Sequence, residues 1–242
     1  MPRPHPPVYP HGELRELLPN VFGVQGSFKI GPMRASRLMV VVREGERLVI
    51  INSLRMNETG LAQLDSLGKV SDVIRLGGFH GSDDPFYKQR YGCKSWAIEG
   101  QTYFTGIDPA KGEVYFEADE YAGATSQLPI EGASLYLFST AQPEALLRLP
   151  AGGGTLVSAD AMHNWQADAY FNFPGRVAMR LAGMLQPHRL GRGWLDNMKP
   201  EPAELAGILE LEFDNVLPGH GQPVIGGAKA KYRPAIERYC SR

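Results

Sequence analysis

Three short polar stretches, each directly after an apolar segment, constrain most strongly how this chain can fold. They lie at residues 79–85, 158–160 and 217–221, and each carries a His or an Asp. A strand that ends at such a residue delivers it to one edge of a sheet. His and Asp side chains that converge are metal ligands or acid/base groups far more often than a single one. The sequence therefore predicts strands whose ends meet at one polar site.

The first third of the chain predicts two neighbouring strands, a helix and a further strand. Near-continuous apolar runs at residues 37–42 and 47–51 are typical of strands that are buried on both faces. Asn57 is suited to cap a helix that Gly68 ends. Residues 70–76 form the next apolar run and lead into the first polar stretch.

A second helix is expected within that first polar stretch. Asp84 is its predicted N-cap and Pro85 its first helical residue, since proline suits that position. Asp83 is expected to cap the helix or to face solvent. A capping Asp needs no metal ion, so capping is the structural alternative to metal binding for Asp84.

The second half of the chain has the same order of strands followed by helices. Runs at residues 128–139, 144–149 and 155–158 are typical of strands. The three glycines at 152–154 indicate a hairpin turn, because no Gly-Lys-Ser/Thr sequence follows them as in a phosphate loop. A helix with an apolar stripe facing a core is predicted from four residues at i, i+4, i+7 and i+8: Val177, Leu181, Met184 and Leu185. Two sheets face to face with helices outside accommodate this order.

The composition is that of a globular chain without a nucleic-acid partner. The 242 residues carry a net charge of -1, so the basic excess of nucleic-acid binders is absent. Residues 1–18 are predicted to be an extended, proline-rich arm and residues 19–242 a single domain. No signal or membrane-spanning segment is expected. Cys93 and Cys240 form no close pair, which fits a reducing compartment and predicts a cytoplasmic protein.

Four arginines lie close together in the sequence, with His188 among them: Arg176, Arg180, Arg189 and Arg192. A solvated helix face is the ordinary interpretation of such a cluster. A phosphate-binding patch is the alternative.

The order and spacing of these segments resemble the metallo-β-lactamase fold superfamily over residues 19–240. In that family the first cluster is His-x-His-x-Asp-His, a later Asp bridges two metal ions, and the last His often lies in Pro-Gly-His-Gly. The resemblance implies an α/β fold, a four-layer αββα sandwich. Laid onto this sequence, it implies four metal ligands: His80, Asp84, Asp160 and His220.

This sequence departs from the family pattern at two positions of the first cluster. Ser82 and Pro85 stand where the second and third His are expected, and no His lies between His80 and His163. Serine is a poor ligand for zinc or iron, and proline offers none. The resemblance then implies a reduced site for one divalent ion, zinc before iron or manganese, or no ion at all.

Asp84 and His163 are the candidate catalytic residues. His163 follows Asp160 by three residues, the offset at which lactonase members of the family carry a tyrosine over the substrate. By resemblance His163 is a substitute ligand or a general acid. The alternative is a surface or supporting histidine.

The activity that the resemblance implies is metal-dependent hydrolysis of an ester, lactone or thioester bond in a small-molecule substrate. A metal-free protein of the same fold that binds or scaffolds is the alternative, motivated by Ser82 and Pro85. Redox chemistry at iron is a third hypothesis. The expected partners include no nucleic acid and no membrane, and a homodimer is left open.

Overall fold

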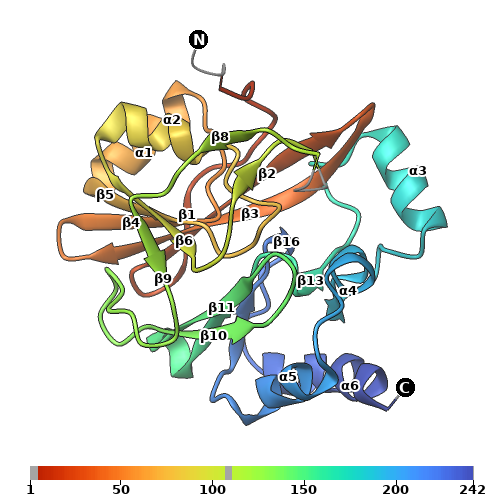
Figure 1. The fold of residues 1–242 in the computed structure, drawn as a ribbon. Helices are drawn as coiled ribbons and strands as arrows, with labels where there is room; N and C mark the ends of the chain where they lie inside the picture. Colours follow the sequence, from red (N-terminus) through yellow and green to blue (C-terminus); the bar gives the residue numbers. More distant parts are fainter. Residues whose placement is uncertain (1–4, 107–110, 242) are drawn as a thin grey trace.

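The structure of the chain is a computed structural model, which describes residues 5–106 and 111–241. Within these residues the two largest sheets lie face to face around an apolar core, and helices cover their outer sides (Figure 1). This is the four-layer αββα sandwich that the order of strands and helices predicts.

The strands of the described residues form two large sheets and two small ones. The largest has seven strands in the order β1 (Arg15–Leu18), β2 (Val21–Ile30), β3 (Met33–Glu44), β4 (Arg47–Ile51), β5 (Lys69–Ile74), β6 (Lys94–Ile98) and β9 (Glu120–Ala122). The second has four, in the order β10 (Ser134–Phe138), β11 (Glu144–Leu149), β12 (Thr155–Val157) and β15 (Asn215–Leu217). Shorter strands form a three-stranded sheet of β14 (Arg189–Leu190), β13 (Met162–Asn164) and β16 (His220–Gly221), and a pair of β7 (Tyr103–Phe104) and β8 (Val114–Phe116).

Side chains that alternate along each strand divide the apolar residues between separate cores. The core between the two sheets contains alternate residues of β3 and of β11, namely Leu38, Val40, Val42, Ala145, Leu147 and Leu149. Met39 and Val41, which lie between them on β3, face the opposite side of the sheet. They pack with Leu61 and Leu64 of the first helix. Both faces of β3 are therefore buried, as its continuous apolar run predicts.

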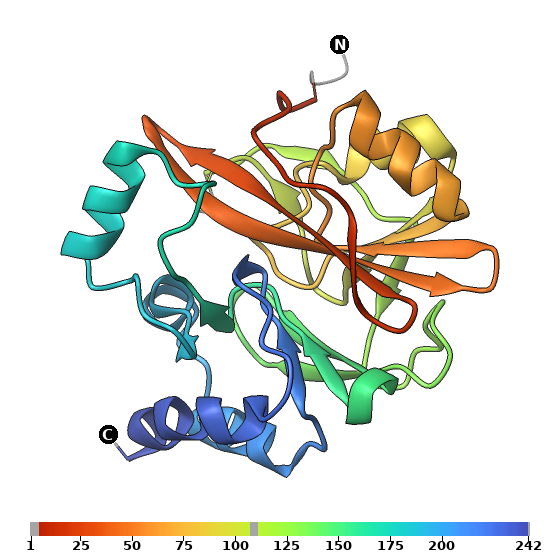
Figure 2. The same cartoon turned by 180° about the vertical axis from the view of Figure 1, so that it is seen from behind.

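The helices lie on opposite outer sides of the sandwich. Figures 1 and 2 show α1 (Glu58–Leu67) and α2 (Asp84–Tyr91) beside the large sheet, and α5 (Pro202–Gly207) and α6 (Ala228–Cys240) beside the second sheet. The predicted cap of α1 is confirmed, because the Asn57 side chain accepts a hydrogen bond from the Gly60 N–H at 2.9 Å. No helix within the described residues is long and apolar enough to cross a membrane.

The prediction that α3 (Phe173–Leu181) turns an apolar stripe toward a core is wrong. Val177 is 41% exposed and Leu181 is 83% exposed. Met184 and Leu185 are half-buried, in contact with a small separate core. The helix ends at Leu181, and Gly183 then turns the chain with a positive φ of 66°. Met184 and Leu185 lie beyond this turn, so they do not continue the helical face on which Val177 and Leu181 lie.

The N-terminal segment lies along β2 rather than apart from it (Figure 2). The Gly12 N–H donates to the carbonyl of Gln25, and the Ser27 N–H donates to the carbonyl of Pro10, each at 2.8 Å. The last residues of the segment form β1. Residues 1–4 lie outside the described part of the chain, and the division into an arm at 1–18 and a domain at 19–242 stays a prediction.

Cys93 is expected to be unreactive in the native protein. It is buried in the core under α1 and α2, and burial, with the nearby Asp84 charge as a further cause, raises the pKa of its thiol to about 12. The thiolate is the reactive form, so Cys93 should resist a thiol-specific chromogenic reagent even at about pH 9. Native protein with Cys240→Ser should show no fast-reacting thiol, and the same variant should show one in denaturant. Fast modification of the native variant would contradict the burial of Cys93.

Candidate metal centre

Three strand ends bring His80, Asp160 and His220 together. His80 lies in the loop after β5, Asp160 follows β12, and His220 begins β16. β12 and β15 are parallel neighbours, so the chain leaves both strands at the same edge of the sheet. The polar stretches that follow them must therefore meet, as the sequence predicts.

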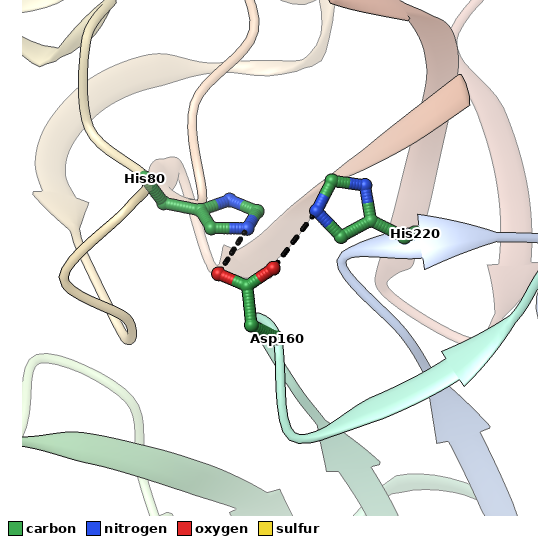
Figure 3. Close-up of side chains that lie close together, drawn as sticks. All are labelled: His80, Asp160 and His220. Carbon is green, nitrogen blue, oxygen red and sulfur yellow. Dashed lines mark hydrogen bonds and ion pairs between the residues drawn. The ribbon is translucent and has the colours of Figure 1, made fainter. Parts of the chain in front are cut away.

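The three side chains form one compact group (Figure 3). One possible ligand atom from each lies within 4.8 Å of the others. Nε2 of His80 lies 3.4 Å from Oδ2 of Asp160, and Nε2 of His220 lies 3.0 Å from Oδ1. All three residues are buried. The carboxylate of Asp160 thus lies between two imidazole rings.

Glycines on both sides of His220 allow this close approach. A Cβ on Gly219 would lie 2.4 Å from the carbonyl oxygen of Ala159. Gly221 has φ of 92°, and a Cβ there would lie 2.0 Å from the carbonyl oxygen of Asn164. Only glycine fits two such positions. The Pro-Gly-His-Gly sequence therefore sets how near His220 comes to Asp160.

The ring of His220 presents its Nε2 to Asp160 in one defined state. Its Nδ1 lies 3.1 Å from the carbonyl oxygen of Ser36, which can only accept, so Nδ1 donates. A neutral ring then carries a lone pair on Nε2, facing a carboxylate oxygen. Nε2 of His220 and Oδ1 of Asp160 would then be two acceptors 3.0 Å apart, which require a cation between them, either a proton or a metal ion. A backbone carbonyl that orients a ligating histidine in this way is typical of metal sites.

Burial and the neighbouring charges set the protonation of the other groups. Burial lowers the pKa of His80, although the Asp160 carboxylate opposes this shift. Burial would raise the pKa of Asp160, but the charges and hydrogen bonds of the surrounding histidines outweigh it and hold that pKa well below its usual range. The carboxylate of Asp160 is thus the ionised member of the group.

His163 also lies beside this group. It belongs to β13, a short strand that the sequence did not predict, where its Cα pairs in register with that of His220. Its Nε2 lies 3.7 Å from Oδ1 of Asp160 and has no hydrogen-bond partner. Burial lowers the pKa of His163 to about 4. His163 is therefore a buried neutral ring at the site, not a surface histidine.

The structure does not bring Asp84 into the group. Its Oδ1 accepts a hydrogen bond from the Ser53 hydroxyl, and its Oδ2 accepts one from the Tyr103 hydroxyl at 2.7 Å. Asp84 is the first residue of α2 rather than its N-cap, so that part of the sequence prediction is wrong by one position. Fully buried, its carboxylate is already satisfied by two hydroxyl donors.

Asp83 is the residue before α2, and its side chain makes no capping hydrogen bond. Asp83 occupies the expected N-cap position, whereas the alternative that it faces solvent is wrong, because it is buried against a cation. Its Oδ2 lies 3.4 Å from Nη1 of Arg37, whose other terminal nitrogen donates to the carbonyl of Ser53. A buried carboxylate needs such a partner. The charge of Arg37 also contributes to lowering the pKa of His80.

Glu144 is the supporting residue that the sequence prediction missed. It is 1% exposed at the start of β11, and its Oε1 accepts hydrogen bonds from the backbone N–H groups of Asp160 and Ala161, at 2.8 Å and 2.6 Å. Burial, together with the Asp160 charge, raises the pKa of Glu144 well above its usual range. The available signal was a Glu heading an otherwise apolar run.

A methyl group at Gly191 is expected to disrupt the site, whereas one at Gly193 is not. A Cβ on Gly191 would lie 1.9 Å from the carbonyl oxygen of Asp160 and 3.0 Å from Nε2 of His163, while one on Gly193 meets nothing within 4 Å. We expect Gly191→Ala to lower the free energy of unfolding by about 1–3 kcal/mol through overpacking. Gly193→Ala, inside α4 (Arg192–Met198), should raise it by about 0.5–1 kcal/mol. Equal denaturant midpoints for the two variants would contradict this packing.

The donor set fits a divalent metal ion. Imidazole nitrogens and a carboxylate oxygen are the usual protein ligands of zinc. Oδ2 of Asp160 and Nε2 of His163 are buried without a hydrogen-bond partner, which is costly unless a cation satisfies them. His80, Asp160 and His220 would hold such an ion, and His163 lies beside them with its Nε2 3.7 Å from Oδ1 of Asp160.

The fold is that of known metallo-β-lactamases. No protein-family model matches the sequence, and no curated protein matches it. The DIM-1 metallo-β-lactamase superposes with a TM-score of 0.62 at 15% identity, covering 94% of this chain and 98% of its own. FIM-1 from Pseudomonas aeruginosa, solved in its mono-zinc form, gives 0.62 at 10% identity, with 98% and 99% covered. A metallo-β-lactamase from Hirschia baltica gives 0.59 at 13% identity, with 94% and 97% covered. The chain therefore has the metallo-β-lactamase fold, in a widely divergent form.

Proposed function

We propose that this protein is a metal-dependent hydrolase that holds one divalent ion between His80, Asp160 and His220. The observation that carries the proposal is the buried Asp160 carboxylate between two imidazole rings, with Nε2 of His220 3.0 Å from its Oδ1. Zinc is the ion that this donor set favours, ahead of iron or manganese. The proposed substrate is a small molecule with an ester, lactone or thioester bond.

Two features favour one ion over two. Both oxygens of Asp84 are engaged by Ser53 and Tyr103, so this carboxylate is withheld from a second ion. The buried guanidinium of Arg37 pairs with Asp83 in the same part of the site and already supplies a positive charge there. The mono-zinc form of FIM-1 indicates that the same fold accommodates a single ion.

The chemistry that a divalent ion supplies is Lewis acidity, which lowers the pKa of water and polarises a carbonyl oxygen. The protein residues provide orientation and proton acceptance. Ser36 fixes the ring of His220 through Nδ1, and Glu144 holds the backbone of Asp160. His163, with a pKa of about 4, is neutral at neutral pH. This favours a role as ligand or proton acceptor over the general-acid role that the resemblance also allows.

Metal analysis and hydrolysis assays on the same preparation test this proposal. Protein purified without chelator should contain about one equivalent of a divalent ion, as expected for a preformed three-ligand site. Chelation should abolish hydrolysis of an aryl ester, a lactone or a thioester, and added zinc should restore it. A content below about a tenth of an equivalent that added metal does not raise would overturn the proposal.

A metal-free binding or scaffolding protein is the second candidate. Ser82 and Pro85 at expected ligand positions favour it, together with the engagement of Asp84 by neighbouring hydroxyls. In that case a chelator should leave the thermal unfolding midpoint of the wild type unchanged. If the protein binds an ion, the chelator should lower the midpoint of the wild type and leave that of His220→Ala unchanged.

We further propose a cytoplasmic location, which the two free cysteines support.

A further inference from the structure

A cavity of about 470 Å³ is lined in part by His163, the histidine beside Asp160. Its walls come from β13, from β14 and the adjacent α4, and from α6 near the end of the chain. The lining residues that matter here are His163, Arg189, Arg192, Asp196 and Arg238. A cavity of this size accommodates part of a small-molecule ligand.

The cavity has an excess of positive charge. Arg189, Arg192 and Arg238 contribute three guanidinium groups, whereas Asp196 is the single acidic residue among the described lining residues. The three guanidinium groups and the one carboxylate together give two net positive charges.

Of the three arginines, only Arg192 has an ion-pair partner within the part of the chain that the structure describes, so most of the positive charge is available to a bound anion. Nε of Arg192 lies 3.7 Å from Oδ2 of Asp196, and its Nη1 donates to the carbonyl of Ala182 at 3.1 Å. Arg189 and Arg238 have no ion-pair partner among the described residues. Like charges that line one cavity repel each other, and a bound anion removes this repulsion.

The structure divides the arginine cluster of the sequence into two groups. Arg189 and Arg192 line the cavity together with Arg238 from the last turn of α6, forty-six residues beyond Arg192 in the numbering. Arg176 and Arg180 lie on α3 and do not line it. The solvated-face interpretation fits the α3 pair, which is exposed.

We propose that this cavity binds a doubly charged oxyanion, a phosphate monoester group of the substrate. A phosphate monoester carries about −1.5 to −2 charges at pH 7, which matches the two net positive charges of the lining. Guanidinium groups bind phosphate through paired, charge-assisted hydrogen bonds. A single carboxylate would supply only half of this charge.

The assignment of this phosphate group to the substrate rests on the proposed hydrolase function. His163 contacts the cavity and also lies 3.7 Å from Asp160. His163 thus connects the lining of the cavity with the metal centre. A substrate that spans both places would be a small phosphorylated ester, lactone or thioester.

Phosphate binding is measured on chelator-treated protein, so that no metal ion contributes. The probe is inorganic phosphate, titrated by calorimetry at pH 7.5 with succinate and acetate in parallel. We expect saturable phosphate binding that Arg238→Ala weakens about tenfold or more, the usual effect of losing a charge-assisted hydrogen bond. Arg180→Ala is the matched control: it removes one exposed arginine outside the cavity and should weaken binding less than about twofold.

Each outcome supports or contradicts the assignment. Equal effects of Arg238→Ala and Arg180→Ala, or no saturable binding to wild type with an unchanged thermal midpoint, would overturn it. Succinate that binds as tightly as phosphate would replace the phosphate assignment by a dicarboxylate. His220→Ala should bind phosphate like the wild type while losing the metal ion. A wild type that binds phosphate but no metal ion contradicts the hydrolase proposal and leaves the anion site unaffected. A wild type that binds the metal ion but no phosphate contradicts only the anion site.

Discussion

Replacing Asp160 by Asn is expected to empty the metal centre. The carboxylate is the single anionic donor of the group and lies between the Nε2 atoms of His80 and His220. Its loss should weaken metal binding by more than the roughly 10–100-fold typical of a supporting residue, so that the purified variant carries almost no ion. The change preserves the shape of the side chain, so the fold should survive. Metal content by mass spectrometry and affinity from competition with a chromogenic chelator measure the effect.

Asp84→Asn is the matched control for this experiment. It makes the same chemical change at the other Asp that the sequence implicated, yet Asp84 contacts Ser53 and Tyr103 rather than the histidines. Hydroxyl groups both donate and accept, so they can reorient toward an amide. We expect Asp84→Asn to retain the ion. If it loses the ion as completely as Asp160→Asn, Asp84 is a ligand and the proposed single-ion site is wrong.

Replacing Glu144 by Ala is expected to cause a large loss of stability. Oε1 of Glu144 accepts hydrogen bonds from the N–H groups of Asp160 and Ala161, and the side chain packs against Gly77 at the edge of both sheets. The substitution leaves two buried donors without an acceptor and creates a cavity. Together these changes should lower the free energy of unfolding by about 2–5 kcal/mol. Equilibrium unfolding in denaturant measures this difference.

Glu144→Gln separates hydrogen bonding from charge. Its amide carbonyl can accept the same two hydrogen bonds, and burial already favours the uncharged form of the native acid by raising its pKa. We expect this variant to remain within about 1 kcal/mol of the wild type, since it leaves no donor unpaired. A loss as large as that of Glu144→Ala would show that the acid acts through something other than these two hydrogen bonds.

Much of the fold follows from local sequence patterns. The strand at residues 47–51 and the helix capped by Asn57 were predicted with their observed limits, because apolar runs and capping residues act within a few positions of themselves. The predicted strand at 128–139 is much shorter, since β10 begins only at Ser134, after Pro129 and the turn at Gly132. Propensity overestimated this strand because the turn residues interrupt it.

The candidate site was predictable where it depends on strand order and unpredictable where it depends on side-chain direction. His80, Asp160 and His220 follow strands or loops that meet at one edge, so their convergence follows from the topology. The direction of Asp84 depends on Tyr103, a residue of the two-residue strand β7. The role of His163 depends on β13, a three-residue strand too short to leave a periodic signal.

The layered architecture and the three residues at the strand ends follow from local patterns in the sequence. Alternating apolar residues encode which faces are buried, and short glycine-bounded motifs encode where the chain turns. The tertiary structure alone decided that Asp84 turns away from the histidines, that Glu144 supports Asp160, and that distant arginines line one cavity. These contacts join residues far apart in the chain, and their geometry is set by how sheets and helices pack rather than by any local pattern.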